Sequence, residues 1–239
     1  MERWAISKKR SLASSGALPH HRIELDVEAY NAVLIGLSRC QEQDAPRRAL
    51  AILRRMLDLA DTGFESARPT SKSWNSVLNT FSRTREPGIA QKAEQLLKWM
   101  IREGSKPDAF SFAAVLHAYQ KNSEAGAAHR ADAIVREMEK RYQAGQLGDG
   151  PDVFHYTIVC ACWAKSGERI AARRCAQILD HMNQQFEDGN AKIKPNIRTF
   201  NAVIDAHARS KDVEEAEKIL FQLIKFYQAN GVDVKKLQK

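Results

Sequence analysis

A basic side chain recurs at one fixed position in this 239-residue sequence. It stands eight residues after a marker position, defined as the residue that follows a recurring aromatic side chain. The five cations are Arg39, Arg83, Lys121, Lys165 and Arg209. Regularly spaced lysines and arginines can neutralise successive phosphates of a nucleic-acid backbone. A cation in the last turn of a helix also complements the helix dipole, by roughly 0.3–1 kcal/mol, so both explanations stay open.

Two other positions in each copy are mostly polar. The first is the marker itself, and the second is the residue after a proline that ends the copy. The markers are Asn31, Asn75, Ala113, Thr157 and Asn201, and the residues after proline are Thr70, Asp108, Asp152 and Asn196. Amide, hydroxyl and carboxylate groups can read base edges by hydrogen bonds. Asp, Asn and Thr are also preferred helix N-caps, which is the structural alternative. We expect both positions to be exposed on the surface that carries the cations.

The elements that position these residues are repeated helical hairpins. Successive markers are 44, 38, 44 and 44 residues apart, which gives five copies of one unit. In each copy the first segment is apolar at i, i+3, i+4 and i+7, as in Tyr30, Val33, Leu34 and Leu37, and this spacing predicts an amphipathic helix. A second segment shows the same helical spacing and begins with a small residue, such as Ala49. No run alternates with period two, so we expect no strands.

The fold class follows from these hairpins. A proline ends each of the first four copies, because it cannot continue the preceding helix and resets the chain for the next one. One hairpin cannot bury its apolar face alone, so stacking is required. We therefore predict an all-α protein, a right-handed α-solenoid of about five helix-turn-helix repeats. The solenoid spans residues 27–230, with repeats at 27–70, 71–108, 109–152, 153–196 and 197–230.

The ends and the composition exclude several function classes. Residues 1–26 predict a basic, disordered N-terminal extension, although their arginines and serines also suit an organelle transit peptide, and 231–239 form a C-terminal tail. Of the formal charge of +8, only +3 falls on residues 26–230, so placement of the cations matters more than bulk charge. No apolar run is long enough to cross a membrane. No metal-ligand spacing or nucleotide-binding motif is present, and we expect no cofactor, no metal and no small-molecule substrate.

The repeated units resemble pentatricopeptide repeats. The units that carry this resemblance are YNAVLIGLSR…ALAILRRM, WNSVLNTFSR…AEQLLKWM…KPD, FAAVLHAYQK…ADAIVREM…PD, YTIVCACWAK…CAQILDHM…KPN and FNAVIDAHAR…AEKILFQL. The resemblance implies a superhelix that binds single-stranded RNA, one base per repeat, in a mitochondrion or chloroplast. The family unit is about 35 residues long, and the longer loops here are a departure that can change the superhelical pitch.

The resemblance also implies which residues choose the bases. In the family, the marker and the residue after proline act jointly. Asn75 with Asp108 is similar to the uracil combination, and Thr157 with Asn196 to the adenine combination. The residue three positions before the marker sandwiches the base, so Phe110 and Phe154 are expected to stack, whereas Glu28 would repel phosphate. The expected contact surface is centred on the second to fourth repeats, with U and A read two nucleotides apart.

Two alternatives to RNA binding remain. A protein-interaction scaffold would use the groove of the solenoid to hold a protein partner, since several copies depart from the base-reading pattern. Some relatives join such repeats to a metal-dependent ribonuclease domain, but this chain shows no clustered aspartates outside the repeats. We therefore expect an RNA-binding adaptor in RNA processing, stability or translation, and no enzyme.

Overall fold

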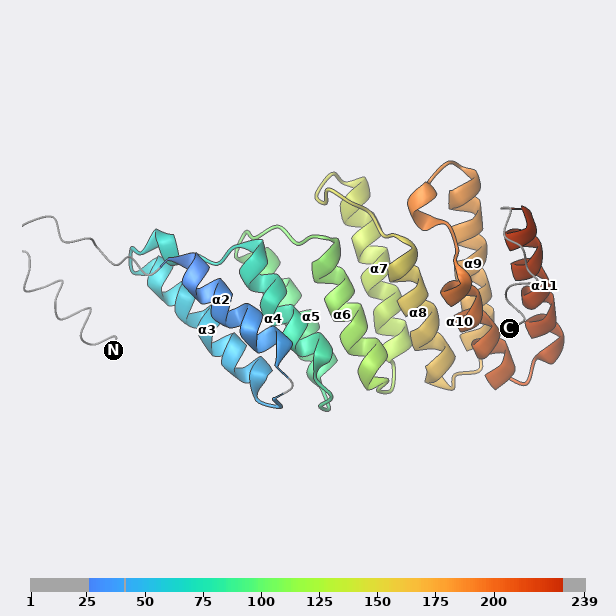
Figure 1. The fold of residues 1–239 in the computed structure, drawn as a ribbon, viewed down its shortest axis with the longest axis horizontal. Helices are drawn as coiled ribbons and strands as arrows, with labels where there is room; N and C mark the ends of the chain where they lie inside the picture. The colour runs from blue at the N-terminus through green and yellow to red at the C-terminus, as the bar shows by residue number, and fades with distance from the viewer. Residues whose placement is uncertain (1–25, 41, 230–239) are drawn as a thin grey trace, which may run out of the picture.

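The computed structural model describes residues 26–40 and 42–229, which form a row of helical hairpins (Figure 1). The α-helices of this part of the chain are α2 (Val27–Arg39), α3 (Ala45–Asp61), α4 (Ser71–Arg83), α5 (Ile89–Arg102), α6 (Ala109–Asn122), α7 (Ala127–Gln143), α8 (Val153–Ser166), α9 (Ala171–Glu187), α10 (Ile197–Arg209) and α11 (Val213–Ala229). The prediction of an all-α solenoid of helical hairpins is confirmed. Residues 1–25 of the expected extension and the expected tail, 231–239, lie outside the described residues.

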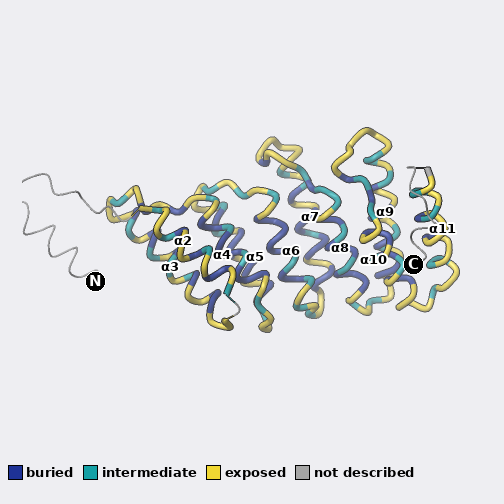
Figure 2. Tube along the Cα trace, viewed as in Figure 1, coloured by how far each residue is buried: buried dark blue, intermediate teal, exposed yellow. Residues whose placement is uncertain are grey.

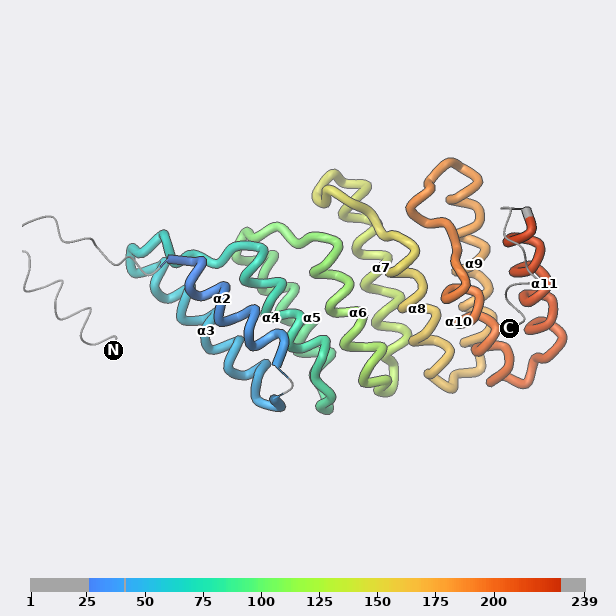
Figure 3. Tube along the Cα trace, viewed as in Figure 1, coloured from blue at the N-terminus to red at the C-terminus, as the bar shows by residue number. Residues whose placement is uncertain are grey.

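Each hairpin pairs a first helix (α2, α4, α6, α8, α10) with a second helix (α3, α5, α7, α9, α11). Every first helix packs against the next first helix, and also against the second helix of the preceding hairpin. The chain therefore advances along the row in sequence order, with the turns inside hairpins along one edge and the connections between hairpins along the other (Figure 3). The first helices form one continuous layer, which places their equivalent residues at regular intervals.

The core lies between the hairpins and follows the repeated apolar stripe. The aromatic residues that precede the markers, Trp74, Phe112, Tyr156 and Phe200, are at most 5% exposed. The small residues at the start of the second helices, Ala49, Ala93, Ala131 and Cys175, are fully buried and allow close approach of the paired helices. Figure 2 shows this buried interior running through the length of the row, with exposed residues at the turns. Stacking rather than any single hairpin thus buries the aromatic side chains.

The helix ends have local causes. Asp26, Thr70, Asp108, Asp152 and Asn196 are the N-caps of the five first helices, so the residues after proline do have the capping role. Each of the first four second helices ends at a glycine with positive φ, as at Gly104 (φ +73°), where Ser105 N–H donates back to the Met100 carbonyl at 3.1 Å. This C-cap hydrogen bond ends the second helix, and the chain then continues to the next proline.

Ion pairs join second helices at the two central junctions. Glu94 of α5 accepts from Arg130 Nε of α7 at 3.2 Å, and Asp132 of α7 accepts from Arg174 Nε of α9 at 3.0 Å. In both pairs the acid follows the small residue of one second helix, and the arginine precedes the small residue of the next. Lys98 and the Tyr119 hydroxyl also bind Glu94, at 2.8 and 2.7 Å. These pairs connect α5 to α7 and α7 to α9.

Candidate nucleic-acid interface

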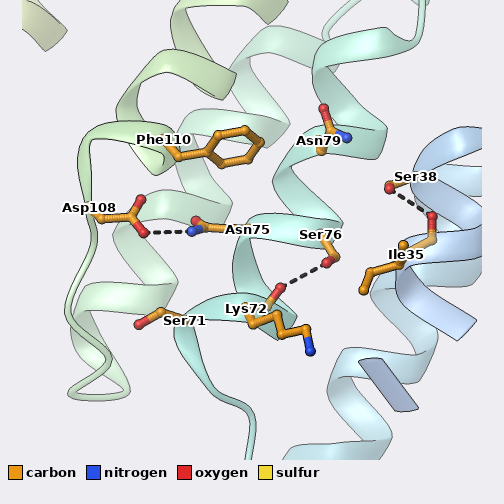
Figure 4. Close-up of a pocket in the computed structure, with 9 residues that line it drawn as sticks. All are labelled: Ile35, Ser38, Ser71, Lys72, Asn75, Ser76, Asn79, Asp108 and Phe110. Atoms are coloured by element: carbon orange, nitrogen blue, oxygen red, sulfur yellow. Dashed lines mark hydrogen bonds between the residues drawn. The ribbon is translucent and has the colours of Figure 1, made fainter. Parts of the chain in front are cut away.

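A cavity of about 410 Å³ opens on the first-helix layer between α2, α4 and α6 (Figure 4). Its lining residues are Ile35, Ser38, Ser71, Lys72, Asn75, Ser76, Asn79, Asp108 and Phe110. Two of the expected base-reading residues, one expected stacking residue and a lysine thus share one hollow. The aromatic ring can stack on a flat ligand, the amide and carboxylate can form hydrogen bonds with its polar edge, and the lysine can bind a negatively charged group on the same ligand.

Asn75 and Asp108 lie face to face in this cavity (Figure 4). Asn75 Nδ2 donates to Asp108 Oδ2 at 2.8 Å, while Asp108 Oδ1 accepts from the Ser111 N–H at 2.8 Å as the N-cap of α6. The Ser111 hydroxyl donates to Asn75 Oδ1 at 2.6 Å and fixes the orientation of the amide. One amide hydrogen of Asn75 and spare lone pairs on Asp108 remain to bind a ligand. The pair expected from the sequence is therefore brought together by the structure.

The Thr157 and Asn196 pair is arranged differently. Thr157 Oγ1 donates to the Val153 carbonyl at 2.7 Å, so it accepts from the Thr199 hydroxyl at 2.8 Å. Asn196 Oδ1 caps α10 through the N–H groups of Arg198 and Thr199. Both side chains are half-buried and are linked through Thr199 rather than directly. Because the single hydroxyl hydrogen of Thr157 is committed, this side chain offers a ligand an acceptor.

The other marker positions differ in exposure. Asn31 is only 1% exposed, because the Ser73 hydroxyl of α4 donates to its Oδ1 at 2.7 Å and closes over it. Ala113 is 8% exposed and has no polar group, whereas Asn201 is exposed. The expectation that the markers are exposed thus does not hold for Asn31 and Ala113. Of their partners, Thr70 is exposed, and half-buried Asp152 is occupied by the N–H groups of Phe154 and His155.

The two expected stacking residues are exposed apolar rings. Phe110 is 51% and Phe154 44% exposed, whereas the aromatic residues before the markers of the last four repeats are at most 5% exposed. Phe154 has one ring neighbour from the preceding first helix, His117, at 5.1 Å between centroids. Burial lowers the pKa of His117, so this neighbour is neutral at neutral pH. In the first two repeats the same position holds Glu28 and Lys72, which form an ion pair at 3.0 Å across α2 and α4.

All five expected phosphate-binding cations are exposed and lie in the last turn of their first helices. Lys121 donates to the Arg83 carbonyl, which brings two of them together. Partial burial, and then the charges of Arg85 and Arg83, lower the pKa of Lys121. Arg85 therefore joins this cation cluster; sequence reasoning missed it because it stands outside the repeated position. Arg209 is instead paired with Asp205 at 2.9 Å.

Two further observations on the described residues concern membrane-spanning helices and metal-binding groups. No helix among them is long and apolar enough to cross a membrane. Three or more His, Cys, Asp or Glu side chains that could share a metal ion do not come together in this part of the chain.

Comparisons with known proteins place the fold. Residues 198–227 match the family model of the PPR repeat, and no curated protein matches the sequence. The pentatricopeptide repeat protein PPR10 from maize is similar in structure, with 22% identity and a TM-score of 0.56 over 96% of this chain, which spans 27% of that protein. The PPR domain of Arabidopsis thaliana protein-only RNase P 1, solved in complex with tRNA, gives 16% identity and a TM-score of 0.57 over 82% of this chain and 90% of that domain. The repeated unit matches the PPR family model in its last copy, and the chain shares the fold of pentatricopeptide repeat proteins.

Proposed function

We propose that the chain binds single-stranded RNA along the surface formed by its first helices. The observation that carries this proposal is the cavity in which Asn75, Asp108, Phe110 and Lys72 meet. An aromatic ring stacks on any base, whereas an amide and a carboxylate bind its edge. The cation cluster at the C-terminal ends of α4 and α6 supplies charge for the RNA backbone. The likeness to a PPR domain solved with tRNA supports the same proposal.

The two marker pairs give this binding a preferred sequence. Uracil carries an N3–H donor between two carbonyl acceptors, which the free amide hydrogen of Asn75 and the carboxylate of Asp108 can match. Adenine carries an exocyclic amino group, and Thr157 offers an acceptor to it. Because these pairs belong to the second and fourth repeats, U and A are read two nucleotides apart.

The test is binding of short single-stranded RNAs that carry U-N-A, compared with RNAs of equal length that lack it and with the matching DNA. We expect U-N-A RNA to bind most tightly, and the affinity to fall steeply with salt. The variant Asn75→Ala should remove the preference for U and leave the preference for A. Its matched control is Asn79→Ala in the same helix and cavity, one turn away from the Asp108 pair.

One observation favours a second candidate function, a protein-interaction scaffold. Asn31 and Ala113 present no exposed polar group, so two of five marker positions lack a base-reading side chain. A scaffold would depend on exposed rings such as Phe110 and Phe154 and be insensitive to charge reversal at Arg83 or Lys121. If charge reversal at Arg83 or Lys121 abolishes RNA binding, the RNA-binding function is favoured. If the same variants still bind a protein partner as tightly as the unchanged chain, the scaffold function is favoured.

The cellular role proposed for the chain is an adaptor in organelle RNA processing, stability or translation. It acts by binding RNA without cutting it. Incubation of the purified chain with its preferred RNA and Mg²⁺ should return intact RNA, and metal-dependent cleavage would contradict the role. Import of a tagged chain into a mitochondrion or chloroplast tests the location.

A further inference from the structure

The C-terminal end of the hairpin row exposes a side chain that every internal junction buries. Leu220 of α11 is 44% exposed. The equivalent residues of the four earlier second helices, four positions after the small residue, are Leu53, Leu97, Val135 and Leu179, and these are at most 5% exposed. Each of those residues has a further hairpin after it, whereas no hairpin follows Leu220 among the described residues. Phe221, the next residue, is 61% exposed.

The N-terminal end shows the complementary difference. Val33 of α2 is 53% exposed. Its equivalents two residues after the other markers are Val77, Val115, Val159 and Val203, which are at most 1% exposed. No hairpin precedes α2 in the described part of the chain. The two ends therefore expose the two halves of the apolar junction that is repeated inside the row.

The charges at the two ends are also complementary. In the internal pairs Glu94–Arg130 and Asp132–Arg174, the acid follows the small residue and the arginine precedes the next small residue. At the C-terminal end the acid position holds Glu217, which is exposed, and at the N-terminal end the arginine position holds Arg48. Arg48 binds Glu42 within its own hairpin, but its side chain is 53% exposed, and such surface pairs exchange readily.

We infer that copies of this chain associate head to tail, with the face around Leu220 and Glu217 of one copy docked on the face around Val33 and Arg48 of the next. The docked pair would repeat the internal junction, with Glu217 binding Arg48 as Glu94 binds Arg130. The two faces differ, so each added copy leaves one free face of each kind, and dimers extend to longer species as concentration rises. This inference does not rest on RNA binding.

Sedimentation velocity of the full chain without RNA, from micromolar to sub-millimolar concentration, tests the inference. We expect a rising average mass, and roughly tenfold or greater weakening in Leu220→Asp and in Val33→Asp. Both positions are exposed, so the variants should fold, which circular dichroism confirms. Ile170→Asp is the matched control, because Ile170 is 48% exposed but lies between α8 and α9, away from both ends.

A charge exchange tests the register of the junction. Glu217→Arg alone and Arg48→Glu alone each place like charges together and should weaken association. An equimolar mixture of the two variants should restore it, because every junction between unlike copies then joins an arginine to a glutamate. Any of four results would overturn the inference. The chain could stay monomeric at all concentrations, or the variants Leu220→Asp and Val33→Asp could associate as strongly as the unchanged chain. The mixture of charge variants could fail to restore association, or Ile170→Asp could weaken association as much as the end variants do.

Discussion

At the scale of the residue, Asp108 has two separate tasks. Its Oδ1 caps α6, and its Oδ2 holds the amide of Asn75, so one side chain connects helix formation to the candidate site. Asparagine caps a helix about as well as aspartate does, whereas it changes the hydrogen-bonding pattern offered to a base. The capping and base-reading explanations for this position are therefore compatible.

The base preference of the second repeat should be exchangeable. The double variant Asn75→Thr/Asp108→Asn gives this repeat the residue types found at Thr157 and Asn196. We expect selected RNA to change from U-N-A to A-N-A, measured by sequencing RNA bound from a random pool. The melting temperature should stay nearly unchanged because the cap is kept. Continued selection of U at the first position would contradict the assignment of these residues.

Glu94 should make stability depend on pH. Burial favours its neutral form, but hydrogen bonds from Arg130, Lys98 and Tyr119 outweigh it and lower the pKa of Glu94 from 4.5 to about 2. The carboxylate therefore stabilises the fold above pH 4.5, and this contribution is lost as the pH falls toward about 2. Because Arg130 and Lys98 are half exposed and screened, we expect about 1–2 kcal/mol rather than the full value of the shift.

The variant Glu94→Gln should lower the free energy of unfolding at pH 7 by that amount and flatten its dependence on pH between 4.5 and 2. Urea unfolding at several pH values measures both effects. Glu137→Gln is the matched control, since the half-exposed Glu137 pairs with Arg141 within one helix and should matter by less than about 0.5 kcal/mol. Equal effects of the two variants would argue against a special role for the central junction.

At the scale of the element, the ends of the first helices collect the cations. The last turns of α4 and α6 and the residues just after α4 bring Arg83, Arg85 and Lys121 together, so their mutual repulsion is relieved when an anion binds. We expect each reversal, Arg83→Glu or Lys121→Glu, to weaken RNA binding and to reduce the slope of log affinity against log salt by about 1.

The control for these reversals is Arg173→Glu, an exposed cation on the second helix α9. It changes the net charge by the same amount but lies outside the first-helix layer, so the slope should stay close to that of the unchanged chain. A reduction equal to that of Arg83→Glu would show that bulk charge, rather than the row of cations, determines binding.

The elements were largely predictable from the sequence, and the exposure of single residues was not. The i, i+3, i+4, i+7 stripe, with the prolines, indicated every hairpin, because both act within one or two turns of helix. The burial of Asn31 depends on Ser73, which is 42 residues away, and on the distance between two hairpins. Arg85 belongs to the cation cluster because neighbouring repeats pack together. The spacing of residues within one repeat does not predict such a contact.

At the scale of the whole molecule, stacking is what gives the separate residues a common surface. The first-helix layer carries the Asn75 cavity, the rings of Phe110 and Phe154, and the cations. The second helices form the other layer, held by the Glu94–Arg130 and Asp132–Arg174 pairs. Head-to-tail association of two copies would extend both layers without a new type of contact.

The most direct test of RNA binding is selection from a random single-stranded RNA pool at moderate salt, with a matching DNA pool in parallel. RNA binding by the first-helix layer predicts enrichment of RNA that carries U-N-A, and loss of this enrichment in Asn75→Ala. Retention of no RNA above the DNA background would contradict it, and would assign the five cations to helix capping on a scaffold for protein partners.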